Sequence, residues 1–243
     1  MFGCMKILLR WVLSFFLLSS FACSSARFSP SSVPFQGITP HQLYEEACKR
    51  SDRIHSTSGE VSLKIKSKDL SGQFNASVKA ETSHVLNLEV DHPLGGLAAR
   101  VRVEGDSFEV QNLSENPPRI EKGRRAWSGV PVEFATSLFL GKVPCPNSLG
   151  RSSQLSITPE GELRVKLSDQ EEWIYRFRVW QGRPWPEALD WKPYFLSRDG
   201  DQKVKIVEMS FDDPDSVDRS PRKWEIRSQE GFIKVRWKDR ASD

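Results

Sequence analysis

The sequence predicts a mainly β fold that opens with a helix and is interrupted by a second one. From residue 59 onward, apolar and polar side chains alternate with a period of two, which is typical of strands with one buried and one solvated face. The alternating runs are short and are separated by tight polar turns, which favours an antiparallel meander. A length of 243 residues with 38% hydrophobic and 28% charged residues suits one globular domain.

The first 22 residues are predicted to be an export signal. Lys6 and Arg10 precede an apolar run over 11–21, which is shorter than the ~20 residues of a transmembrane helix. The following Ala22-Cys23 resembles the lipobox of bacterial lipoproteins, in which the cysteine receives a lipid, although Ser20 and Phe21 depart from that pattern. We expect Cys23 to be lipidated. Ordinary signal-peptidase cleavage after Ala22 stays open as the alternative.

Residues 23–38 are predicted to form a flexible tether behind the lipidated cysteine, because they are rich in Ser and Pro and lack periodicity. A helix signal follows directly. Thr39 stands at the N-cap, Pro40 at the first helical position and Gln42 at the third, an arrangement typical of a capping box. We expect this helix to end near Arg53, at the start of a single β-barrel-like domain over 39–243.

The body after this helix divides into alternating runs and one apolar helical segment. Residues 131–141 begin with Pro and end with Gly, and are predicted to form the second helix. The charged runs 122–125, 171–172, 212–213 and 219–223 are expected to be solvated turns or loops. The predicted strands centre on 61–66, 74–80, 86–90, 97–103, 108–110, 163–167, 173–180, 203–209 and 232–237.

Charge and cysteine content narrow the function. Loss of Lys6 and Arg10 with the signal leaves 33 basic against 32 acidic residues, a net charge of +1, which argues against charge-driven nucleic-acid binding. Cys48 and Cys145 are then the two cysteines without another role. In an oxidising exported compartment they are a candidate disulfide, and the alternative is two small buried hydrophobes that do not meet.

The sequence carries no recognisable catalytic, cofactor or metal motif. It lacks His-Glu-x-x-His, Cys-x-x-Cys, Gly-x-Ser-x-Gly and a Gly-rich phosphate loop. The four histidines, His41, His55, His84 and His92, fall in different predicted elements. We therefore expect a protein that is not an enzyme, with no catalytic residue, no metal and no cofactor.

The segment from Val90 to Leu97 places an apolar residue at a predicted turn. Leu94 lies between Pro93 and Gly95, where Pro restricts φ and Gly allows positive φ, so its side chain is expected at the tip. The alternatives are that Leu94 folds back under the sheet or is one of the single surface leucines that are common in proteins. This Pro-Leu-Gly turn and the order of the predicted elements over most of residues 41–240 resemble the LolB family of outer-membrane lipoprotein receptors, in the LolA/LolB superfamily. The stretches 180–186 and 212–223 depart from that pattern.

The resemblance implies an incomplete antiparallel β-barrel covered by helices, with acyl chains held on its concave apolar side. It implies that Pro93, Leu94 and Gly95 form the turn that assists insertion of acyl chains into the membrane. The expected lipid-binding residues are Leu86, Leu88, Ala99, Val101, Leu138 and Phe139.

The implied partners are the acyl chains of lipoproteins, a LolA-like periplasmic carrier and the membrane that holds the lipid anchor. Because Ser24 is not acidic, the expected location is the outer membrane, facing the periplasm, and the expected state is a monomer. Two alternatives remain: a structural or adaptor lipoprotein whose barrel is filled by its own side chains, and a hydrolase with unrecognised residues.

Overall fold

A computed structural model describes most of the chain after residue 34. The described residues are 35, 37–48, 54–67, 71–82, 84–127, 129–146, 148–150, 153–167, 171–196, 202–204 and 206–243. They belong to a compact unit that runs from Ser32 to Asp243. The predicted export signal and Cys23 lie outside the described residues.

The described residues are mainly β, as predicted. The helices are α2 (Pro40–Cys48) and α3 (Val132–Phe139). In the described ranges, neither helix has the length and apolar character needed to cross a bilayer.

The strands are β1 (Ser56–Ser67), β2 (Ser71–Glu81), β3 (Val85–Asp91), β4 (Leu97–Glu104), β5 (Ser107–Asn112), β6 (Arg119–Arg124), β7 (Ala126–Trp127), β8 (Val130–Pro131), β9 (Ser153–Ile157), β10 (Leu163–Leu167), β11 (Glu171–Trp180), β12 (Arg183–Leu196), β13 (Gln202–Val204), β14 (Val207–Pro214), β15 (Pro221–Ser228), β16 (Gly231–Trp237) and β17 (Ala241–Ser242).

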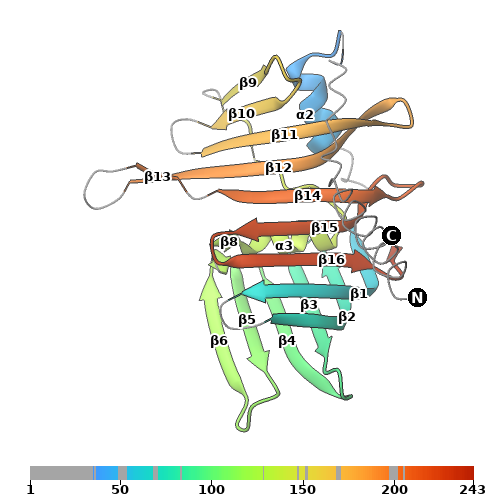
Figure 1. Ribbon diagram of the computed structural model, residues 1–243, viewed down its shortest axis with the longest axis vertical. Coiled ribbons are helices and arrows are strands. Elements are labelled where there is room, and N and C mark those ends of the chain that lie inside the picture. Colours follow the sequence, from blue (N-terminus) through green and yellow to red (C-terminus); the bar gives the residue numbers. More distant parts are fainter. Residues whose placement is uncertain are drawn as a thin grey trace, which may run out of the picture. The chain divides into compact units, whose positions relative to one another are not determined.

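One large antiparallel sheet contains fifteen of the strands in the described part of the chain (Figure 1). Its main order is β6-β5-β4-β3-β2-β1-β16-β15-β14-β12-β11-β10-β9, with β13 beside β12 and β17 beside β1. The first strand therefore pairs with the second and with a late strand, β16, and joins an N-terminal meander to a C-terminal one. The sheet is open, with β6 and β9 at its edges, which confirms the predicted incomplete barrel.

Helix α2 starts as the sequence predicts. The backbone N–H of Thr39 donates to Gln42 Oε1 at 2.8 Å, and the N–H of Gln42 donates to Thr39 Oγ1 at 3.2 Å. This reciprocal pair confirms the capping box. Leu43 and Ala47 are buried on the side of the helix that packs against β9, β10 and β12. The expected end near Arg53 lies outside the described residues.

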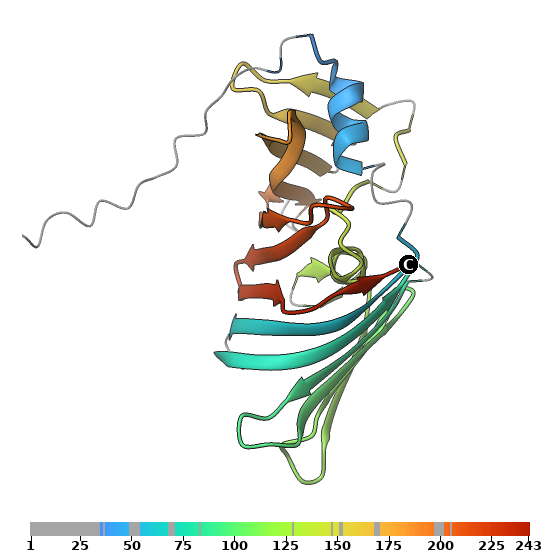
Figure 2. The ribbon, with the colours of Figure 1, turned by 90° about the vertical axis from the view of Figure 1, so that its right-hand side faces the viewer.

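Helix α3 crosses the sheet on the same side as α2 (Figure 2). Pro131 occupies its N-cap, and Gly141 follows its end with a φ of +79°, a conformation that favours glycine. Its buried residues, which include Phe134, Leu138 and Phe139, face the strands. The helix therefore covers the inner face of the sheet, and the core lies between them.

The Trp- and Pro-rich stretch 180–186, which departs from the LolB pattern and lies mostly outside the predicted strands, is largely the start of β12. Its prolines are tolerated because Pro184 and Pro186 pair only with β11, while pairing with β14 begins at Ala188. A proline in such an edge-like position removes no ladder hydrogen bond. Trp185 between them is 1% exposed and donates its indole N–H to the carbonyl of Arg219 at 2.9 Å.

Several charged runs expected to be solvated turns or loops are strands. The run 122–125 lies mostly in β6, whose exposed charges suit a sheet edge. The doublet 171–172 opens β11, and most of 219–223 lies at the start of β15. The predicted strand 203–209 is divided between β13 and β14. In the charged runs, polar side chains leave no clear alternation from which a strand could be predicted.

Candidate functional site

The inner face of the sheet is an apolar surface that meets the aromatic side chains of α3. Phe134 contacts two tryptophans, Trp173 of β11 and Trp191 of β12, with ring centroids 5.4 and 5.2 Å apart and edge-to-face geometry. Phe139 contacts Trp224 of β15 in the same way at 5.1 Å. Edge-to-face pairs of this kind contribute about 0.5–1.5 kcal/mol beyond their buried area. The helix is thus fixed to the C-terminal meander by the aromatic contacts of Phe134 and Phe139.

This inner face also carries hydrogen-bond donors without partners. The indole N–H groups of Trp173, Trp224 and Trp237 and the hydroxyl of Thr136 are buried and have no hydrogen-bond partner among the described residues. Buried polar groups are normally satisfied, and leaving one unpaired costs about 1–3 kcal/mol. The packing of α3 against the sheet therefore leaves these four buried donors unpaired among the described residues.

The structure brings the six expected lipid-binding residues together on this face. Leu138 is fully buried under the sheet, and Phe139 is 5% exposed beside it. On the strands, Leu86, Leu88 and Val101 are buried in the same apolar cluster, and Ala99 packs against it while half-buried. Leu86 and Val103 are more deeply buried than Leu88 and Val101, which lie nearer to the turn that joins β3 and β4.

That turn holds Leu94 in solvent, as expected. Leu94 is 91% exposed, so the alternative in which it folds under the sheet does not occur. The turn is closed by backbone hydrogen bonds: the N–H of His92 donates to Gly96 O at 2.8 Å, and the N–H of Gly95 donates to His92 O at 2.9 Å. The N–H of Leu94 donates to Nδ1 of His92 at 3.1 Å. Positive φ values at both glycines complete the turn and leave the Leu94 side chain at its tip.

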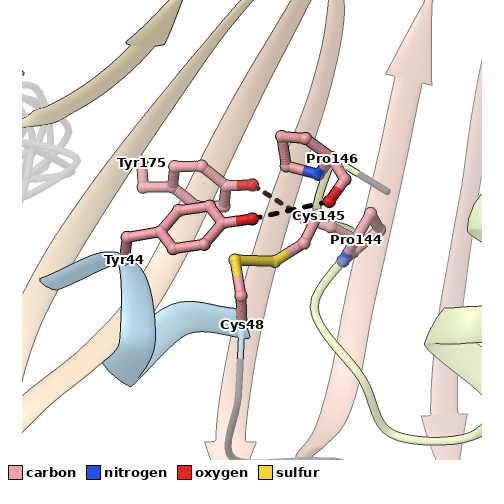
Figure 3. Close-up of a disulfide and its surroundings, with 6 residues drawn as sticks. All are labelled: Tyr44, Cys48, Pro144, Cys145, Pro146 and Tyr175. Atoms are coloured by element: carbon pink, nitrogen blue, oxygen red, sulfur yellow. Dashed lines mark hydrogen bonds between the residues drawn. A yellow bond between two sulfur atoms is a disulfide. The ribbon is translucent and has the colours of Figure 1, made fainter. Parts of the chain in front are cut away.

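A covalent clamp holds the segment after α3 against α2 (Figure 3). Cys48 and Cys145 form a disulfide with a Cα–Cα distance of 5.8 Å. Tyr175 and Tyr44 donate their hydroxyls to the carbonyls of the prolines before and after Cys145, at 3.0 and 3.4 Å. Burial raises the pKa of Tyr175 well above its ordinary value, so this hydroxyl remains a donor. The clamp fixes where α3 lies over the sheet.

Arg240 ties the C-terminal end of α3 to the last strands of the sheet, and nothing in the sequence pattern pointed to it. Its guanidinium donates to the carbonyl of Leu140 at 3.2 Å and to Ser220 Oγ, and pairs with Asp218 at 3.1 Å. Burial lowers the pKa of Arg240, while the Asp218 carboxylate opposes that shift. A Cβ at Gly141 would lie 2.4 Å from this guanidinium, so glycine is required beside it.

The described residues show no metal centre. No three His, Cys, Asp or Glu side chains in these ranges gather closely enough to hold an ion. What the geometry offers is an apolar, helix-covered face that leads to an exposed apolar turn.

Comparison with known proteins finds likeness in structure and not in sequence. No family model and no curated protein matches the chain. A domain from Vibrio parahaemolyticus that carries the name outer membrane lipoprotein-sorting protein aligns at 9% identity over 83% of this chain and 91% of that one, with a TM-score of 0.51. A DUF1329 family protein from Desulfovibrio piger aligns at 10% identity over 84% and 92%, also with a TM-score of 0.51. A LolA superfamily protein from Nitrosomonas europaea aligns at 12% identity over 84% and 93%, with a TM-score of 0.42.

The chain shares its fold with the lipoprotein-sorting domain and with the DUF1329 family protein. The open antiparallel sheet and the helix on its inner face are the features that the resemblance of the Pro-Leu-Gly turn led us to expect.

The N-terminal segment that leads into this body is partly fixed. Phe35, near the end of the predicted tether, packs edge-to-face on Phe177 of β11 with ring centroids 6.3 Å apart. Ile38 also packs against the core. The chain thus enters the body beside the C-terminal meander, whereas Leu94 belongs to the N-terminal one.

Proposed function

We propose that this protein binds the acyl chains of lipoproteins on the inner face of its sheet and assists their insertion into the outer membrane. The observation that carries the proposal is Leu94, 91% exposed at the tip of the turn between β3 and β4. The apolar residues of these two strands lead from the turn to the core under α3. Support also comes from the shared fold with a domain named for lipoprotein sorting.

Apolar burial can supply the binding energy. Each buried methylene contributes about 0.8 kcal/mol, so roughly ten methylenes would support micromolar binding before ordering costs. Ala99 and Val110, half-buried on neighbouring strands, provide the accessible part of the path.

In this proposal the role is binding and transfer, without catalysis or a cofactor. Transfer needs no nucleotide if each successive acceptor binds the acyl chains more tightly. A LolA-like periplasmic carrier would supply the lipoprotein. The receptor would act as a monomer held in the outer membrane, facing the periplasm, by a lipid on Cys23. The non-acidic Ser24 suits that location.

A second candidate function has its own observation. Leu138 is 0% exposed, and Phe139 packs against Trp224 and Trp237, so the space under α3 is filled by the chain itself. This filling favours an adaptor lipoprotein that contacts another envelope protein. The adaptor predicts no uptake of acyl chains, which separates it from the first proposal.

Substitution Ala99→Phe tests the acyl path. A phenyl ring at this half-buried inner position would block the approach from the Leu94 turn, because it occupies the surface that an acyl chain would cover. We expect uptake of a fluorescent fatty acid to fall at least about tenfold, the equivalent of losing roughly two methylenes of burial. The matched control is Ser77→Phe, exposed on the outer face of β2, which should bind like the wild type. Equal uptake by the two variants, or no uptake by the wild type, would favour the adaptor.

Substitution Cys23→Ala tests the anchor. Without a thiol no lipid can be attached, so the variant should move from the membrane fraction to the soluble periplasmic fraction. Mass spectrometry of the membrane-extracted wild type should show the lipid on Cys23. If wild type and variant associate equally with membranes, the anchor is removed from the proposal, and cleavage after Ala22 becomes the better interpretation.

A further inference from the structure

The face of the sheet opposite α3 carries a basic groove. It has a volume of about 570 Å³, within the range of small-ligand sites. It runs over strands β1, β2 and β14–β16. The groove is lined by Ser62, Lys64, Gln73, Asp213, Arg222, Lys234, Arg236, Trp237 and Lys238. Five of these nine residues are cationic and one is acidic.

Most of this positive charge is not neutralised within the protein. Lys234 pairs with Glu225 at 3.6 Å, and Lys238 pairs with Glu60 at 3.9 Å. Asp213 is engaged by Lys223, outside the lining, at 3.4 Å. The other three cations, Lys64, Arg222 and Arg236, have no ion-pair partner among the described residues. The groove therefore presents about three uncompensated positive charges.

The strand register brings like charges face to face at this groove. Lys64 on β1 stands directly opposite Lys234 on β16, and Arg236 stands opposite Lys223 on β15. Directly opposed like charges destabilise an antiparallel pair. An anion bound between two such pairs on adjacent strands would relieve this repulsion.

We propose that this groove binds a compact anion that carries at least two phosphate groups. Two phosphates carry about −3 to −4 charges near neutral pH, which matches the uncompensated charge. Arg222 and Arg236 lie on neighbouring strands, and each guanidinium can donate two parallel hydrogen bonds to one phosphate. The Ser62 hydroxyl and the Gln73 amide supply neutral donors.

The surroundings favour a polar ligand in this groove over apolar docking. Among the described residues, the exposed large hydrophobic side chains are Leu94, Ile120, Val179, Ile206 and Val217, and none lies on β1, β2, β15 or β16. The inference is independent of the acyl-binding proposal, because the phosphate contacts use Lys64, Arg222 and Arg236. Trp237, which packs on Phe139 of α3, is the one lining residue that the helix-covered face also includes.

Calorimetry of the detergent-solubilised full chain with inorganic pyrophosphate tests the groove. The double variant Arg222→Gln/Arg236→Gln should bind at least about tenfold more weakly, since each lost contact is charge-assisted. The matched control is Arg119→Gln/Arg164→Gln, which removes the same charge from exposed positions on β6 and β10. No binding of pyrophosphate by the wild type, or equal weakening by both double variants, would overturn the proposal.

Thermal unfolding gives a second readout for the same groove. Without pyrophosphate and at low salt, Lys64→Gln should melt at the wild-type temperature or above it, because the repulsion from Lys234 is removed. With pyrophosphate, its melting temperature should rise less than that of the wild type. A variant that melts lower without ligand and gains as much from pyrophosphate would show a structural lysine and contradict the proposal.

Vesicles identify the source of the phosphate groups. Phosphatidylcholine vesicles with and without phosphatidic acid are compared for the wild type and the groove double variant, so that any lipid anchor is common to both proteins. Binding that requires phosphatidic acid, is competed by pyrophosphate and is lost in the variant assigns a lipid headgroup. Pyrophosphate binding without vesicle preference assigns a soluble phosphate compound. Both results support the phosphate site.

Discussion

The double substitution Cys48→Ala/Cys145→Ala is expected to lower the free energy of unfolding by about 2–5 kcal/mol. The disulfide joins residues 97 positions apart and therefore restricts a long loop of the unfolded chain. It also holds the segment after α3 against α2, so its loss frees one side of the helix that covers the inner face. Urea unfolding of the oxidised wild type and the variant measures the difference, which would be a large part of the stability of an ordinary domain.

The neighbouring hydrogen bond provides the matched control. Tyr175→Phe removes the hydroxyl that bonds the carbonyl before Cys145 but leaves the disulfide in place. It should cost about 1 kcal/mol, or somewhat more because the buried carbonyl loses its partner. If the free energy of unfolding of the double cysteine variant is at least as large as that of Tyr175→Phe, the disulfide is not the main interaction that stabilises this clamp.

Substitution Leu94→Glu should impair delivery of lipoprotein to membranes while leaving the melting temperature nearly unchanged. The side chain is 91% exposed and therefore adds little to folding. Its insertion into hydrocarbon would contribute roughly 1.5–3 kcal/mol, and a carboxylate cannot enter that environment without a large cost. Delivery should therefore fall at least about tenfold. The measurement is transfer of a labelled lipoprotein from carrier to vesicles, beside thermal unfolding of the same preparation.

Val217→Glu is the matched control for Leu94. Val217 is also 91% exposed, in the connection between β14 and β15, where its N–H is bonded to Asp215 Oδ1 at 2.8 Å. The same change of charge there should affect neither stability nor delivery. Equal loss of delivery in both variants would indicate a general effect of acidic charge. A large loss of stability in Leu94→Glu with delivery intact would give Leu94 a structural role.

Some elements of this fold can be predicted from the sequence because they depend on local interactions. The capping box of α2 needs only residues three positions apart, and both of its hydrogen bonds are present. The turn at Leu94 depends on the conformational limits of Pro93 and Gly95, and the exposed leucine follows from them. Strands with one solvated face, such as β2 and β3, show their period directly in the chain.

Elements without that period were missed. In β12, prolines are tolerated because only one neighbouring strand pairs with that part of the strand. This pairing is a property of the assembled sheet and cannot be predicted from the segment's own sequence. In β6, almost all residues are exposed, and Gly123 is required because a Cβ there would lie 2.4 Å from the ring of Phe108 on β5. Neither the pairing of β12 nor the contact of Gly123 with Phe108 can be predicted from the sequence of one segment.

The sequence by itself determined the mainly β class, the start of α2 and the exposed Leu94, because each depends on neighbouring residues or on a local period. Only the tertiary structure decided that β1 pairs with β16, that Cys48 meets Cys145, and that Lys64 faces Lys234 beneath a basic groove. These contacts join residues about 100 to 170 positions apart. The free energy of these contacts depends on how distant segments pack together in the sheet and core. It therefore cannot be predicted from residues that are neighbours in the sequence.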